Sequence, residues 1–135
     1  MRLVYDGKAI PLLVENSAFE GVKRIAGRVA EDICKVTGCK PSVASEQLAE
    51  GQTRAVLCAT VGKSSLTEAL EQEGALDLGR VRGRREVFLI QKLTAAQLSQ
   101  TKAFSGLEEL LLICGSDKRG TIYGMFTLSE YIGVS

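Results

Sequence analysis

Apolar residues recur at steps of three and four between Phe19 and Val36, while the charged residues of this stretch lie elsewhere on the helical wheel. This spacing predicts an amphipathic helix with one buried face. Ser17 and Glu20 have the spacing of a capping box, and Gly38 is a typical residue to end a helix. We therefore expect a helix over residues 19–37.

Short apolar runs predict the strands. The runs at residues 3–5 and 10–14 flank Asp6-Gly7, a strong turn signal, which indicates a hairpin or two short strands. The nearly continuous run 54–61, RAVLCATV, suits the middle of a sheet. Further strands are expected at 41–44, 86–93 and 107–114.

Two more helices complete the expected order. A short one is predicted over residues 65–73, where Ser65 and Glu68 repeat the capping-box spacing, and a last one over residues 118–132. Without an internal repeat or a long linker, residues 1–135 should form one domain, a sheet with two principal helices.

The last helix is apolar on two sides. Its first face is predicted to cover a sheet with Ile122, Met125, Phe126 and Ile132, around the small Ser129. The second face carries large residues where solvent is expected: Tyr123, Leu128 and Tyr131. A helix that is apolar on two sides is normally buried on two sides. This second face is therefore predicted to meet a second copy of the chain or another domain.

Composition excludes several functions. Seventeen Lys and Arg against sixteen Asp and Glu give a net charge of +1, so no overall field attracts nucleic acid or an anionic membrane. The arginines between residues 80 and 85 are interpreted as a solvated loop. The chain has no His, which removes the usual base of Ser and Cys nucleophiles and the commonest metal ligand.

The cysteines and the apolar runs bear on metal or cofactor binding and on the cellular compartment. Cys58 and Cys114 lie in apolar runs, and the spacing of Cys34 and Cys39 has no second close pair to complete a zinc site. We expect free structural thiols and no cofactor or metal, with a metal or a disulfide as the alternative. The first residues show no signal peptide, and no apolar run nears the roughly 20 residues that span a bilayer. This predicts a cytoplasmic protein, with a secreted or periplasmic parent left open.

Two glycine-containing turns resemble anion sites. Gly62-Lys63-Ser64 lacks the earlier glycine of a phosphate loop, since Leu57 stands there, and is interpreted as a capped turn. The second turn, residues 115–121, follows a strand and opens a helix that Ser116 or Asp117 should cap. Lys118 and Arg119 oppose the helix dipole in its first turn. They indicate an external carboxylate, solvated charge, or a small-molecule anion site.

The segment 115–135, GSDKRGTIYGMFTLSEYIGVS, closely resembles the end of the N-terminal domain of glycoside hydrolase family 115, the xylan α-1,2-glucuronidases. ATVGKSSLTEAL at 59–70, REVFLIQKL at 85–93 and the helix at 19–37 with Thr37-Gly38 occur in the family's order. A looser Arg-Gly, Tyr-Gly, Leu-Ser pattern closes the related domains of hexosaminidases and family 67 α-glucuronidases.

The resemblance implies an α+β fold, a two-layer sandwich in which a mixed β-sheet carries two main helices on one face, placed before a (β/α)8 catalytic barrel. The barrel and later domains of such enzymes supply the acid and base carboxylates, so we expect no catalytic residue here. Ser116, Asp117, Lys118 and Arg119 match the family motif and should contact the barrel or line the cleft edge, where the full enzyme could take an acidic xylo-oligosaccharide. The alternatives are a stand-alone carbohydrate-binding domain, which the few aromatics disfavour, and a homodimeric interaction domain.

Overall fold

The computed structural model describes residues 3–46, 48 and 51–131, which form seven strands and four α-helices with one 3-10 helix. The strands are β1 (Val4–Tyr5), β2 (Lys8–Ala9), β3 (Leu12–Leu13), β4 (Val43–Ala44), β5 (Arg54–Thr60), β6 (Phe88–Thr94) and β7 (Glu109–Gly115). The helices are α1 (Glu20–Thr37), α2 (Ser65–Gln72), α3 (Ala95–Leu98), η1 (Lys102–Phe104) and α4 (Lys118–Tyr131).

Five strands form one mixed sheet in the order β4-β3-β5-β7-β6. The first four are parallel to their neighbours, and β6 runs antiparallel to β7 at the edge. The apolar run of β5 lies in the middle as predicted, because a central parallel strand is covered on both faces. All of its residues after Arg54 are buried.

Asp6-Gly7 forms the predicted hairpin turn between β1 and β2, which pair antiparallel. Both residues have positive φ, 51° and 75°, which is the backbone twist that two-residue hairpins require. The second apolar run does not stay in the hairpin. After β2 the chain enters the main sheet as β3.

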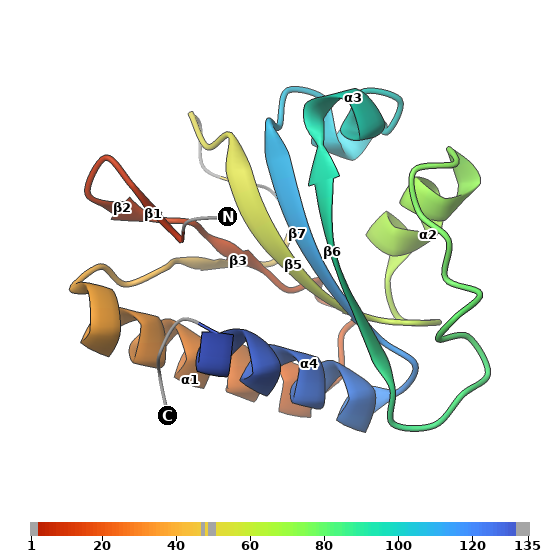
Figure 1. Cartoon of the computed structure of the whole chain (residues 1–135), viewed down its shortest axis with the longest axis horizontal. Helices are drawn as coiled ribbons and strands as arrows, with labels where there is room; N and C mark the ends of the chain where they lie inside the picture. The colour runs from red at the N-terminus through yellow and green to blue at the C-terminus, as the bar shows by residue number, and fades with distance from the viewer. Residues whose placement is uncertain (1–2, 47, 49–50, 132–135) are drawn as a thin grey trace.

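The two long helices, α1 and α4, pack side by side on one face of the sheet (Figure 1). Val22, Ala26 and Ile33 of α1 join Val56 and Ile113 of the sheet in one core, together with Met125 and Leu128 of α4. The predicted α+β class, with a mixed sheet and two main helices on one face, is confirmed.

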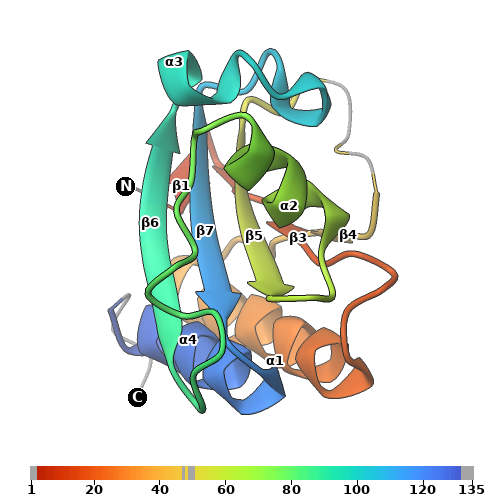
Figure 2. The ribbon, with the colours of Figure 1, turned by 90° about the vertical axis from the view of Figure 1, so that its right-hand side faces the viewer.

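The opposite face of the sheet is covered as well, by α2 and by irregular chain (Figure 2). Leu70 of α2, Leu78 of the following loop and Phe104 of η1 pack there against Leu57 and Leu112. Neither α3 nor η1 was predicted, because elements of four and three residues are too short to show a period.

Both predicted capping boxes are wrong in detail. Helix α1 ends at Gly38 as expected, but Ser17 does not cap its start, because the Ser17 hydroxyl donates to the Lys63 carbonyl, 2.7 Å away. Helix α2 is capped one residue earlier than predicted: Ser64 Oγ accepts from the Thr67 N–H at 3.1 Å.

The four cysteines are free thiols, as predicted, and they fall into two classes. Cys58 and Cys114 are buried in the sheet, and burial raises the pKa of each thiol to about 12. Cys34 and Cys39 are only half-buried.

We expect a thiol reagent at about pH 8 to modify Cys34 and Cys39 rapidly and the other two cysteines only after unfolding, because a buried neutral thiol is a poor nucleophile. Peptide mapping of the modified protein measures this, and fast labelling of Cys58 would contradict it.

In the described part of the chain, no group of three or more Cys, Asp or Glu side chains is arranged to hold a metal ion. None of its helices is both long enough and apolar enough to span a membrane.

Candidate functional site

The candidate residues gather at the end of the sheet where β3, β5 and β7 finish and the antiparallel β6 begins. This side of the sheet is called here the carboxyl edge. Strands β3 and β5 are neighbours, yet the helices that follow them, α1 and α2, cover opposite faces of the sheet. Such a divergence opens a crevice beside the carboxyl ends of the strands, the usual ligand position in open α/β sheets.

A side chain of the protein itself lines this crevice. Glu15, which follows β3, is buried and accepts hydrogen bonds from the Ser64 hydroxyl, from the Ser65 hydroxyl at 3.1 Å and from the Leu66 N–H at 3.2 Å. Its carboxylate therefore occupies the start of α2, where a bound anion would lie. The interpretation of Gly62-Lys63-Ser64 as a capped turn is confirmed, and Lys63 turns to the ring of Phe19, 4.8 Å from its centroid.

At the other end of the edge, Ser116 and Asp117 join the start of α4 to the segment before β6. Asp117 is the predicted cap: its Oδ1 accepts from the Gly120 N–H at 2.8 Å, and its Oδ2 accepts from the Glu86 N–H at 3.0 Å. Ser116 Oγ accepts from the Val87 N–H at 3.2 Å. The predicted site residues therefore fix two segments that are about thirty residues apart in the chain.

Glu86, which the sequence did not single out, is the second acidic residue here. It has a positive φ of 56°, uncommon for a residue with a side chain, and its Oε1 accepts from Arg119 Nη1 at 3.0 Å. Arg119 thus meets a carboxylate of its own chain. Lys118 is exposed, and its stem lies over Gly21 at the start of α1.

The cap makes Asp117 sensitive to acid. Hydrogen bonds from the N–H groups of Gly120 and Glu86 hold the pKa of Asp117 below its ordinary value of 3.8, and the charges of Arg119 and Arg85 act the same way. Because the folded pKa is the lower one, Asp117 stabilises the fold above about pH 4, and this contribution is lost as the pH falls through the folded value.

We expect Asp117→Asn to keep the cap but to flatten the dependence of the unfolding free energy on pH below about pH 4, because asparagine also caps helices and does not titrate. Urea denaturation at several acidic pH values measures the slope. An unchanged slope would show that Asp117 carries none of it.

Helix α4 lies unusually close to the sheet because its inner side is made of small residues. A Cβ atom added to Gly120 would lie 2.2 Å from the Val87 carbonyl oxygen, and one added to Gly124 would lie 2.7 Å from the Ile113 side chain. Between them Thr121 Oγ1 donates to the Ala59 carbonyl at 2.9 Å and lies 2.6 Å from Thr60 Oγ1. The glycines of the Arg-Gly and Tyr-Gly pairs of the motif therefore serve helix–sheet contact.

The division of α4 into faces differs from the prediction. Leu128, expected on the outer face, is buried with 7% of its surface exposed, and Phe126, expected to cover the sheet, is 42% exposed. Tyr123 is 45% exposed, as predicted for an outer residue. The side chain of Tyr131 and the whole of Ile132 lie outside the described residues. Lys118 is exposed beside α1, and four further exposed residues line up along the outer side of α4: Arg119, Tyr123, Phe126 and Glu130.

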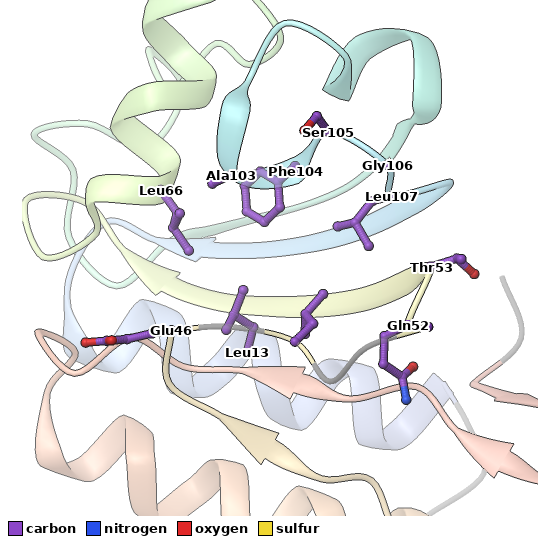
Figure 3. A pocket seen from close by; sticks show the side chains of 12 residues that line it. Leu13, Glu46, Gln52, Thr53, Leu66, Ala103, Phe104, Ser105, Gly106 and Leu107 are labelled. Atoms are coloured by element: carbon purple, nitrogen blue, oxygen red, sulfur yellow. The ribbon is translucent and has the colours of Figure 1, made fainter.

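A cavity of about 670 Å³ lies between α2, η1 and the start of β5. Leu13, Leu66, Phe104 and Leu107 place apolar side chains along it (Figure 3). Of the twelve described residues that line it, only Glu46 is charged. Glu46, Gln52, Thr53 and Ser105 add polar groups to this apolar lining, a combination that binding sites also have.

Three acidic groups at the carboxyl edge are engaged by the chain. Glu15 accepts hydrogen bonds at the start of α2, Asp117 caps α4, and Glu86 pairs with Arg119. General acid–base cleavage of a glycosidic bond needs two carboxyl groups that face a substrate. These three groups instead hold loops together.

No known sequence family matches the chain, and neither does any curated protein. Among solved structures, a similar one is a family GH115 4-O-methyl-α-glucuronidase, BtGH115A, with specificity for decorated arabinogalactans. The two align with a TM-score of 0.67 and 21% sequence identity, over 98% of this chain and 14% of the enzyme. This chain spans only a small part of the enzyme it resembles. It has the fold of a GH115 α-glucuronidase domain, as the segment 115–135 indicated.

Proposed function

We propose that the chain is a non-catalytic accessory domain of an α-glucuronidase of the GH115 type, and that it supports the catalytic barrel of the same parent protein. The observation that carries this proposal is the match of nearly the whole chain to 14% of one such enzyme. A domain that is a small part of an enzyme ordinarily depends on the rest for chemistry.

The geometry of the carboxyl edge favours a role in supporting the barrel. Ser116 and Asp117 fix the start of α4 to the segment before β6, while Lys118 and Arg119 project from it and are exposed. A rigid edge with an outward cation suits contact with a carboxylate on a neighbouring domain. Because Arg119 already meets Glu86, we assign Lys118 to the junction with the barrel or to the rim of the substrate cleft.

The substrate class of the parent follows from the same likeness. The sequence resemblance favours xylan that carries glucuronic acid, and the similar enzyme is described as specific for decorated arabinogalactans. The common chemistry is a polysaccharide with 4-O-methylglucuronic acid side groups, so both polymers belong in the test.

The decisive experiment incubates the purified 135-residue chain, and separately the protein encoded by its complete reading frame, with glucuronoxylan and with decorated arabinogalactan. We expect the chain alone to release no uronic acid, and the longer protein to release it from one polymer. Turnover by the chain alone would overturn the proposal, as would a reading frame that ends at residue 135.

Nuclear magnetic resonance titration separates this proposal from a carbohydrate-binding function. An accessory domain should show no saturable shifts with acidic xylo-oligosaccharides. Saturable shifts would favour the binding function, which otherwise has little support, because exposed aromatic platforms are scarce: the chain has three Tyr, four Phe and no Trp.

A further inference from the structure

We propose that this chain associates with a second copy of itself through the outer side of α4, with the two helices antiparallel about a twofold axis. The inference does not rest on the accessory function, because it concerns only the surface of α4. The contact surface, called here the α4 stripe, consists of Arg119, Tyr123, Phe126 and Glu130.

The α4 stripe has the make-up of a contact surface. Tyr123 and Phe126, at its centre, keep 45% and 42% of their surface exposed, and both belong to the few large apolar residues that the fold leaves outside. Aromatic residues are enriched at protein interfaces and depleted on ordinary surfaces. A basic residue and an acidic residue border this aromatic centre on either side.

The order of the stripe is self-complementary. Arg119 lies four residues before Tyr123, and Glu130 lies four residues after Phe126. The stripe therefore has the same spacing when read in either direction, with opposite charges at its two ends. A twofold contact joins the same patch on both copies, so such a stripe can pair with itself only when the helices are antiparallel.

In that arrangement each end of the stripe meets its complement. Arg119 of one copy lies opposite Glu130 of the second copy, twice in the dimer, and each Tyr123 lies opposite Phe126 of the second copy. Along an α-helix the two charges are about 16 Å apart, so both ion pairs form at the ends of one straight contact. A parallel arrangement would place like charges together and is disfavoured.

The internal ion pair leaves Arg119 able to take part. Its Nη1 donates to Glu86, yet its side chain remains 70% exposed, and a guanidinium has five N–H donors in a planar fork. Glu86 therefore holds Arg119 at the start of the stripe, and Arg119 keeps further N–H donors for the carboxylate of Glu130 in the second copy.

A stripe of four residues is small, so the dimer is weak. Interfaces well below about 1,200 Å² belong to transient complexes. We expect half-association at a protein concentration between about 10 µM and about 1 mM. Sedimentation equilibrium over this range, at low salt, should show the average mass rising from monomer toward dimer.

Charge reversal tests the register. In Arg119→Glu both ends of the stripe are acidic, and in Glu130→Arg both are basic, so each variant should form its own dimer at least about tenfold more weakly. Mixed in equal amounts, the two variants should associate again, because every end of one meets its opposite on the other. The recovery by itself would also occur between parallel helices. The weakening of each single variant requires the antiparallel pairing, because parallel helices already place like charges together in the unchanged chain.

Neutral substitutions test the centre of the stripe. Tyr123→Ser and Phe126→Ser should each weaken association at least about tenfold. Val36→Ser is the matched control, because Val36 is 49% exposed on α1 and lies outside the stripe, so it should leave association unchanged. Circular dichroism of each variant then tests whether it is folded.

A chain that stays monomeric up to about 1 mM would overturn the proposal, and so would variants that fail to associate when mixed. Loss of association in Val36→Ser but not in Tyr123→Ser would place the contact elsewhere and also overturn it. If the chain is monomeric but binds its parent's separately produced barrel through Tyr123, the stripe belongs to the barrel. Binding to the barrel would also support the accessory function, whereas the other outcomes leave that function to the uronic acid assay.

Discussion

Gly120→Ala is expected to lower the free energy of unfolding by about 3 kcal/mol, a large share of the roughly 5–15 kcal/mol that stabilises a domain. The added methyl group would lie 2.2 Å from the carbonyl oxygen of Val87 and 3.1 Å from its carbonyl carbon. Both are backbone atoms of the segment that enters β6. They cannot rotate aside, so α4 must separate from the sheet edge.

The matched control is Gly27→Ala in α1. A Cβ atom at Gly27 meets nothing within 4 Å, and the residue lies in the middle of an α-helix. Here alanine should stabilise the protein by about 0.5–1 kcal/mol, because it has the higher helix propensity. Urea denaturation followed by circular dichroism measures both variants. Equal effects of the two substitutions would show that α4 does not press on Val87 as described.

Glu15→Ala is the second substitution with a large expected effect, a loss of about 2–4 kcal/mol. Its carboxylate is buried and accepts from the Ser64 and Ser65 hydroxyls and from the Leu66 N–H. Removing it leaves these donors without their acceptor beside the start of α2, and it takes a negative charge from the positive end of that helix. Glu15→Gln keeps one oxygen acceptor and should lose about half as much.

Glu46→Ala is the matched control for this second substitution. Glu46 is exposed and accepts a single hydrogen bond, from Asn16 Nδ2 at 2.9 Å, so its loss should change stability by no more than about 0.5 kcal/mol. Thermal unfolding of all three variants gives the comparison. A Glu15→Ala variant as stable as Glu46→Ala would mean that water replaces the carboxylate without cost.

The sequence predicted the elements whose period is long and clear. Helix α1 repeats its apolar residues over eighteen positions, and β5 and β7 each have a run of seven residues, so the two main layers of the fold were recoverable. Asp6-Gly7 predicted its hairpin because a turn with two positive φ angles favours this residue pair.

Contacts between distant segments were not predictable in the same way. Ser17 has capping-box spacing, but its hydroxyl binds a carbonyl 46 residues away, and spacing alone carries no information on that partner. Glu86 was overlooked because its role depends on Asp117 and Arg119, which approach it only when β6 pairs with β7.

The faces of α4 were misassigned for a reason that the sequence does contain. The prediction gave weight to large apolar side chains and therefore placed Phe126 inward and Leu128 outward. The structure turns Gly120 and Gly124 toward the sheet, and Leu128 follows them on the same side, four residues after Gly124. Small residues four positions apart indicate a close backbone contact. They identify the buried side of this helix better than the positions of its large apolar side chains do.

This close contact also bears on how segments like 115–129 are interpreted in other sequences. Its small residues bring a helix within touching distance of a strand, and the polar atoms of Asp117 and Thr121 hold it there. A search pattern built on these residues would select proteins in which a helix and a sheet share this spacing. Assigning glucuronidase activity to such proteins would then require a separate sign of a barrel and its carboxylates.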